Sequence, residues 1–165
     1  MALRFRSPKN GEVETYIAER LTELNLTLAT AESCTGGLIA HRITEVSGAS
    51  SFFHGGVVAY SNALKESLLE VSHATLEEFG AVSEATAREM AEGACRLLGA
   101  DLAVAVTGIA GPTGGTPEKP VGLVYIAVAR WDTCRVTRNQ FFGDRSDVKR
   151  QTADRALAML KEWLE

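Results

Sequence analysis

The chain has 165 residues, 45% of them apolar and 23% charged, which is the size and composition of one globular domain with an ordinary core. The formal charge of −4 and the scattered cationic residues exclude a basic surface for nucleic acid. No apolar run approaches the roughly 20 residues that span a bilayer, and the N-terminus MALRFRSPKN lacks the apolar segment of a signal peptide, so we expect a cytoplasmic protein with no membrane partner.

The first half of the chain predicts helices and strands in alternation. Residues 1–11 are expected to be an N-terminal extension of the single domain 1–165. Apolar spacing and turn residues then divide the sequence. In chain order we predict a helix over 12–25, a strand over 26–30, a helix over 38–46, a strand over 52–60 and a helix over 61–71.

The second half continues this alternation and ends in a hairpin and a helix. Thr75 and Glu78 match a capping box for a short helix that stops at Gly80, and Ser83 caps a longer helix that ends at Gly99. The remaining elements are strands over 101–107, 121–130 and 133–141 and a last helix that begins after Asp144. This order predicts a mixed α/β sheet covered by helices on both faces.

The segment AESCTGG, residues 31–37, lies between a predicted strand and a predicted helix. A turn of this kind exposes the side chain at its apex, so Ser33 is a candidate nucleophile. The backbone N–H groups of Thr35, Gly36 and Gly37 could hold an oxyanion or a phosphate. The alternative is a plain helix start, in which Ser33 or Thr35 is the N-cap and the glycines pack on the sheet.

A serine nucleophile needs a base, and no histidine stands in an obvious position for it. Lys65 follows the strand end at Tyr60 by about one helical turn, and a lysine can accept a proton when burial lowers its pKa. The alternative for Lys65 is a solvated surface residue. Lys119 competes for the same role, although its place between prolines favours anion binding.

Cys34 is the rival nucleophile, because a thiolate attacks better than a hydroxyl. Alternation along an extended segment points Ser33 and Cys34 to opposite sides, so only one of them faces a pocket. Cysteine is among the most buried residue types, and we therefore assign Cys34 to the core. Three distant cysteines without a CxxC pair indicate reduced thiols, and three isolated histidines give no metal-binding spacing, so we expect no metal.

Three strand ends carry polar or flexible residues, in the segments AESCTGG, AYSN and VTGIAGPTGG. If these strands are parallel neighbours, their loops share one rim of the sheet, where ligands of open α/β sheets bind. The long loop 108–120 is rich in glycine and proline, and we interpret it as functional. Arg145 at the start of the last helix could bind a phosphate or pair with Asp144 or Asp147 at the surface.

Six motifs in order resemble one known family: TAESCTGG, GGVVAYSNALK, FGAVSEATAREMA, AVAVTGIAGPTGG, KPVGLVYIAV and FFGDR. They are similar to the C-terminal domain of competence-damage-inducible proteins, and the resemblance runs from about Glu12 to the end. The resemblance implies a three-layer α/β/α sandwich, commonly dimeric, that needs no metal or other cofactor. It also implies deamidation of nicotinamide mononucleotide to nicotinic acid mononucleotide and ammonia, a step of pyridine nucleotide salvage. Larger relatives carry a further N-terminal domain linked to ADP-ribose hydrolysis, so only the deamidase half is inferred here.

Carried over to this sequence, the motifs make Ser33 the nucleophile and Lys65 its base, with Tyr60 beside them. Substrate binding is assigned to Glu32, Thr35, Gly36, Gly37, Thr107, Gly108, Gly111 and Arg145, the last two toward the phosphate. Two alternatives stay open: a nucleotide-binding module that does not turn its ligand over, and an amidase on another amide that depends on Cys34.

Overall fold

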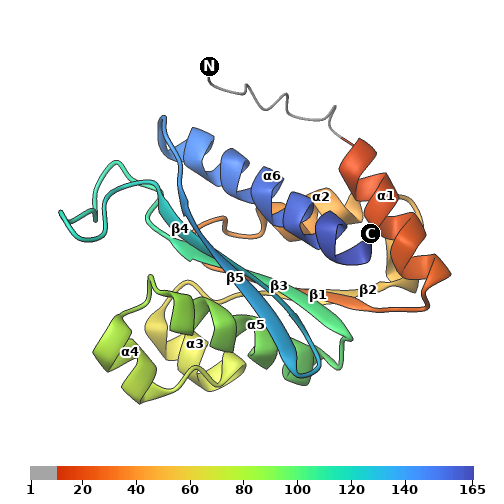
Figure 1. Cartoon of the computed structure of the whole chain (residues 1–165), viewed down its shortest axis with the longest axis horizontal. Helices are drawn as coiled ribbons and strands as arrows, with labels where there is room; N and C mark the ends of the chain where they lie inside the picture. Colours follow the sequence, from red (N-terminus) through yellow and green to blue (C-terminus); the bar gives the residue numbers. More distant parts are fainter. Residues whose placement is uncertain (1–10) are drawn as a thin grey trace.

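A computed structural model of the chain describes residues 11–165; the segment expected as an extension lies, apart from Gly11, outside the described residues. The described residues form one five-stranded sheet between two layers of helices (Figure 1). The strands are β1 Leu28–Glu32, β2 Phe53–Val58, β3 Leu102–Gly108, β4 Leu123–Arg130 and β5 Thr133–Gln140. The α-helices are α1 Glu12–Glu23, α2 Leu38–Thr44, α3 Asn62–Leu69, α4 His73–Phe79, α5 Glu84–Leu98 and α6 Arg145–Leu164, and a short 3-10 helix covers Ala49–Ser51.

The strand order is β2-β1-β3-β4-β5. The pairs β1–β2 and β1–β3 are parallel, whereas β3–β4 and the hairpin β4–β5 are antiparallel. Helices α1, α2 and α6 cover one face of the sheet, and α3, α4 and α5 cover the other (Figure 1). The predicted three-layer sandwich with a mixed sheet and a C-terminal hairpin is therefore confirmed.

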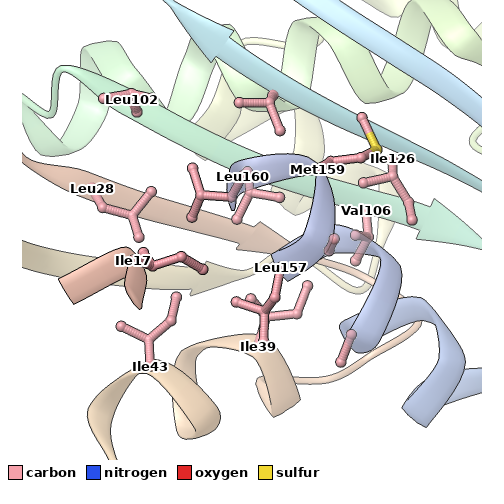
Figure 2. Close-up of a cluster of buried hydrophobic side chains, with 14 of the residues drawn as sticks. Ile17, Leu28, Ile39, Ile43, Leu102, Val106, Ile126, Leu157, Met159 and Leu160 are labelled. Atoms are coloured by element: carbon pink, nitrogen blue, oxygen red, sulfur yellow. The ribbon is translucent and has the colours of Figure 1, made fainter. Parts of the chain in front are cut away.

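The two faces of the sheet carry different cores because side chains alternate along each strand. On the side of α1, α2 and α6 the core is built from large aliphatic residues, among them Ile17, Leu28 and Leu157 (Figure 2). On the α5 side the sheet presents mainly alanines, so α5 packs closely against it. Gly93 of α5 makes close packing on the next helix possible, because a Cβ at this position would overlap the carbonyl of Leu69 at the end of α3.

Several boundaries differ by one or two residues from the sequence prediction, and two of the differences have local hydrogen bonds beside them. Strand β1 begins at Leu28 rather than Leu26, because the N–H and hydroxyl of Thr27 both donate to Asp101 Oδ2, at 2.9 and 2.8 Å. Helix α4 is capped by Ser72, whose hydroxyl accepts the N–H of Thr75, so the capping box predicted for Thr75 was wrong. The caps predicted at Ser83 and Asp144 are confirmed.

Candidate active site

The three polar strand ends meet at one edge of the sheet. Strands β2, β1 and β3 are neighbours and run parallel, so the residues that follow Val58, Glu32 and Gly108 lie side by side. The N–H of Ser33 donates to the carbonyl of Val106 (3.1 Å), and the N–H of Ala59 donates to the backbone carbonyl of Glu32 (2.9 Å). The rim that the sequence predicted from AESCTGG, AYSN and VTGIAGPTGG is therefore present in the fold.

Ser33 and Lys65 are in direct contact at this rim. Lys65 Nζ lies 3.1 Å from Ser33 Oγ. The amine also lies 3.0 Å from the carbonyl of Ala59 and 3.3 Å from that of Tyr60, in the link between β2 and α3. Only 1% of Lys65 and 8% of Ser33 is exposed, so the lysine is not the solvated surface residue that a helical position alone suggests.

The surroundings of Lys65 favour the neutral amine. Burial lowers the pKa of Lys65 from its ordinary value of 10.5, because the charged form loses its hydration. Within residues 11–165 no carboxylate lies within 4.0 Å of its Nζ to oppose this effect. A neutral amine has two N–H groups and one lone pair. If the carbonyls of Ala59 and Tyr60 accept the two N–H groups, the lone pair is directed at the hydroxyl of Ser33.

The turn after Ser33 is organised by Glu32. Its buried carboxylate accepts hydrogen bonds from Thr35 Oγ1 (2.6 Å), Ile39 N (2.9 Å) and Ala40 N (3.0 Å), the last two at the start of α2. The sequence assigned Glu32 and Thr35 to substrate binding, but neither lines the cavity beside Ser33, since their polar side-chain atoms bind each other and the helix. The N-cap of α2 is Gly37, with a positive φ of 103°, and not Ser33 or Thr35.

The backbone amides of this turn differ in what they can bind. The N–H of Gly36 donates to the carbonyl of Ser33 (3.1 Å), so it is not available for an oxyanion as the sequence suggested. Among residues 11–165, no backbone or side-chain acceptor takes the N–H of Cys34 or of Thr35. These two amides follow the serine directly. Gly36 and Gly37 shape the turn and do not line the cavity.

Cys34 has the character of a core residue. It is 5% exposed and packs in the cluster beneath α2 and α6, as predicted. It also borders the cavity beside Ser33, so the expectation that only one of the two residues faces the pocket was wrong. Burial raises the pKa of its thiol to about 12. The thiolate, which is the reactive form of cysteine, is therefore scarce at neutral pH.

Arg145 connects two walls of the site. Its Nη1 donates to the carbonyl of Gly111 in the glycine-rich loop (2.8 Å), and its Nη2 donates to the hydroxyl of Tyr60 (2.9 Å). It pairs with neither Asp144 nor Asp147, which cap α6 instead. Tyr60 and Arg145 both line the cavity, whereas Gly111 takes part through its carbonyl.

Thr107 and Gly108 form the third wall, at the end of β3. Thr107 Oγ1 donates to the carbonyl of Ala81 (2.7 Å) and so holds the segment between α4 and α5 against the site. Gly108 faces β4 at a point where a Cβ would crowd Val124. Lys119 lies elsewhere, because its Nζ donates to the carbonyl of Phe79 at the end of α4.

These walls enclose a cavity of about 200 Å³ beside the serine and the lysine. The sequence predicted seven of its residues: Cys34 as the rival nucleophile, and six as site residues, namely Ser33, Tyr60, Lys65, Thr107, Gly108 and Arg145. It missed Asn62, Ala81, Val82 and Ala110 as lining residues, although each lies within a quoted motif, because none of their side chains is a nucleophile, a base or a cation. A larger cavity of about 620 Å³ between α1, α2 and α6 has none of these residues, so its size does not mark it as the reactive site.

Residues 11–165 contain neither a metal-binding cluster nor a membrane-spanning helix. No three His, Cys, Asp or Glu side chains of this range gather into a group that could hold a metal ion. No helix of the described range has both the length and the hydropathy that crossing a membrane requires.

An open α/β/α sandwich with a serine and a buried lysine at the carboxyl ends of parallel strands defines the class: an α/β protein with its ligand site at the strand ends. The comparison with family models gives the identity within this class. The chain belongs to the CinA C-terminal domain family, whose model matches residues 10–164. The resemblance found in the sequence is thereby confirmed.

Individual relatives agree with this assignment. The chain is 51% identical over 153 residues to a putative competence-damage inducible protein of Thermoanaerobacter sp. (strain X514), and 54% identical over 154 residues to a CinA-like protein of Syntrophus aciditrophicus. These alignments cover 93% and 92% of the chain but only 37% and 36% of the relatives, so the chain spans little more than a third of their length.

Solved structures show the same fold. A CinA superfamily protein of Klebsiella pneumoniae superposes with a TM-score of 0.91 at 38% identity and covers 95% of this chain and 98% of that one. The competence/damage inducible protein CihA of Agrobacterium tumefaciens gives a TM-score of 0.87 at 41% identity, with both chains covered fully.

Proposed function

We propose that the chain is an amidohydrolase that converts nicotinamide mononucleotide and water into nicotinic acid mononucleotide and ammonia. The observation that carries the proposal is the contact of 3.1 Å between Lys65 Nζ and Ser33 Oγ in a site without a carboxylate partner for the lysine. The substrate class comes from the family resemblance. The chemistry comes from the geometry of the pair.

In the first step Lys65 acts as a general base. Its neutral amine accepts the proton of the Ser33 hydroxyl while the oxygen attacks the carboxamide carbon of the substrate. The tetrahedral intermediate carries a negative oxygen, for which the N–H groups of Cys34 and Thr35 are the available donors of the turn. The protonated Lys65 then gives its proton to the departing nitrogen, and ammonia leaves an acyl ester on Ser33.

In the second step water hydrolyses this ester. Lys65, neutral again, accepts a proton from the water as the oxygen attacks the acyl carbon. The bond to Ser33 Oγ then breaks, and the proton on Lys65 returns to the serine. The carboxylate product leaves, and both side chains are restored for another turnover.

The decisive experiment measures ammonia release from nicotinamide mononucleotide by the wild type and by Ser33→Ala, Lys65→Met and Cys34→Ala. Circular dichroism confirms that each variant is folded. We expect activity in the wild type and in Cys34→Ala, and losses of at least about 10³-fold in the other two. A folded wild type that binds the nucleotide without releasing ammonia would instead identify a binding module.

Two further properties belong to this proposal. We place the activity in the cytoplasm, since Cys34, Cys95 and Cys134 are free thiols, the state that a reducing compartment maintains. The family resemblance predicts a homodimer, and sedimentation equilibrium of the full chain measures this directly.

A further inference from the structure

Lys149 is a cation of the site rim to which no motif drew attention. It lies on α6 one turn after Arg145, and it is half-buried. Its Nζ stands 3.9 Å from the point where a Cβ on Gly36 would lie, so the ammonium faces the turn that follows Ser33. Because Gly36 has no side chain, no Cβ stands in contact with the ammonium at this point of the turn.

Within residues 11–165, Lys149 has neither a hydrogen-bond acceptor nor a carboxylate within 4.0 Å. The other cations on the same helix do have partners. Arg150 pairs with Asp147, Arg155 with Glu162, and Lys161 with Glu165. A half-buried ammonium that lacks a counter-charge is a binding point for an anion from outside the chain.

The charges around Lys149 leave it free to bind such an anion. The carboxylate nearest in sequence to the serine, Glu32, is taken up by Thr35 and by the first amides of α2. Asp144 and Asp147 bind each other's backbone N–H groups at the start of α6. The charge of Lys149 also reaches the site, since it acts to lower the pKa of Cys34, although burial outweighs it.

The size of the cavity indicates where a nucleotide must extend. Its volume of about 200 Å³ is below the roughly 300–1,000 Å³ typical of pockets for whole drug-sized ligands. It therefore suits the ring that carries the carboxamide, and the ribose and phosphate continue outside it. Arg145 stands at the cavity wall, and Lys149 lies about 6 Å further along α6.

We propose that Lys149 binds the phosphate of the mononucleotide and makes the site selective for a phosphorylated substrate. This inference rests on the proposed function and adds the residue that distinguishes the nucleotide from its nucleoside. Arg145, whose guanidinium already binds Gly111 and Tyr60, is the positioning residue that joins the walls beside the phosphate. Lys149 supplies the point charge.

The test measures dissociation constants of nicotinamide mononucleotide and of nicotinamide riboside, which lacks the phosphate. Calorimetry uses the inactive Ser33→Ala protein, alone and combined with Lys149→Met, Lys149→Arg or Lys161→Met. Lys161 is the matched control, because it is a lysine of the same helix that pairs with Glu165. We expect Lys149→Met to weaken binding of the mononucleotide about 10- to 100-fold.

The same change should alter riboside binding by less than about 2-fold, Lys149→Arg should restore most of the lost affinity, and Lys161→Met should change neither ligand. An equal loss for both ligands, or no loss for either, would overturn the assignment to the phosphate. Ammonia release by the wild type is measured in parallel. If the mononucleotide binds through Lys149 but no ammonia appears, the catalytic proposal fails and the phosphate assignment stands. If Ser33→Ala binds neither compound, the phosphate assignment is overturned, and the wild-type ammonia assay alone decides the catalytic proposal.

Discussion

Replacing Lys65 by methionine tests whether this lysine is the general base of the proposed reaction. Methionine keeps the length and most of the volume of the side chain, so the buried space between α3 and the strand ends stays filled. The change removes the amine whose Nζ lies 3.1 Å from Ser33 Oγ. Among the described residues that line the cavity there is no His, Asp or Glu that could replace it.

The structure sets the expected magnitudes. A positioned general base contributes about 10²- to 10⁴-fold, and because no second base is at hand we expect kcat/KM to fall about 10³- to 10⁴-fold. This is about 4 to 5.5 kcal/mol of transition-state stabilisation, at 1.36 kcal/mol per factor of ten. The carbonyls of Ala59 and Tyr60 lose a donor at about 1 kcal/mol each. The cost of burying an amine is removed, so the free energy of unfolding should change by less than about 2 kcal/mol.

The assay combines ammonia release with thermal unfolding and a pH series. Since burial lowers the pKa of Lys65 below 10.5 and only the neutral amine is a base, wild-type kcat/KM should rise with pH through that pKa. The residual activity of Lys65→Met should lack this rising limb of the pH profile. The reasoning is refuted if folded Lys65→Met keeps more than about a tenth of the wild-type kcat/KM, or if the variant retains the same pH limb.

Three further outcomes are expected. Cys34→Ala should retain most of the wild-type kcat/KM in the ammonia assay. Iodoacetamide at pH 8 should leave the wild type active, because the pKa of the Cys34 thiol is about 12. Rapid inactivation would instead assign Cys34 a catalytic role. Glu32→Gln should lower the free energy of unfolding in urea by about 1.5–3 kcal/mol, because an amide cannot accept from three donors as a carboxylate does; an unchanged midpoint would contradict this. Gly93→Ala should destabilise the chain by about 1–3 kcal/mol in the same urea titration despite the better helix propensity of alanine, since the added Cβ overlaps the carbonyl of Leu69; a stabilised variant would show that α3 and α5 can separate at no cost.

The fold follows closely from local patterns. Buried strands such as β3 are recognisable in the sequence as runs of alanine and valine. Ser83 and Gly99 mark the two ends of α5, because serine is a preferred N-cap and glycine a preferred C-cap. The start of β1 could not be found in this way. It lies beside a contact with Asp101, a residue 74 positions away whose carboxylate accepts the N–H of Thr27.

A residue of the site could be predicted from the sequence only where its chemical type indicates its role. Residue type and position made Ser33 and Lys65 candidates, but only the family motifs decided between a base and a surface residue, because a lysine on a helix has the same local pattern whether it is solvated or 1% exposed. Glu32 and Thr35 were predicted to bind substrate because the letters AESCTGG do not show whether the carboxylate points to the cavity or to the start of α2. Lys149 had a usable signal: it lies four positions after Arg145 and so shares its helix face.

The placement of Glu32 makes an adjacent acid compatible with the proposed role of Lys65 as the base of Ser33. A carboxylate close to Lys65 would raise its pKa and keep it protonated, and the amine could then accept no proton. The fold prevents this by directing Glu32 to the N-terminus of α2, where its charge meets the amides of Ile39 and Ala40. A thiolate at Cys34 would raise the pKa of Lys65, but the pKa of this thiol is about 12, and burial of Lys65 is the dominant effect. The carboxylate thus builds the turn that presents Ser33 and adds no charge beside Lys65 that would oppose the lowering of its pKa by burial.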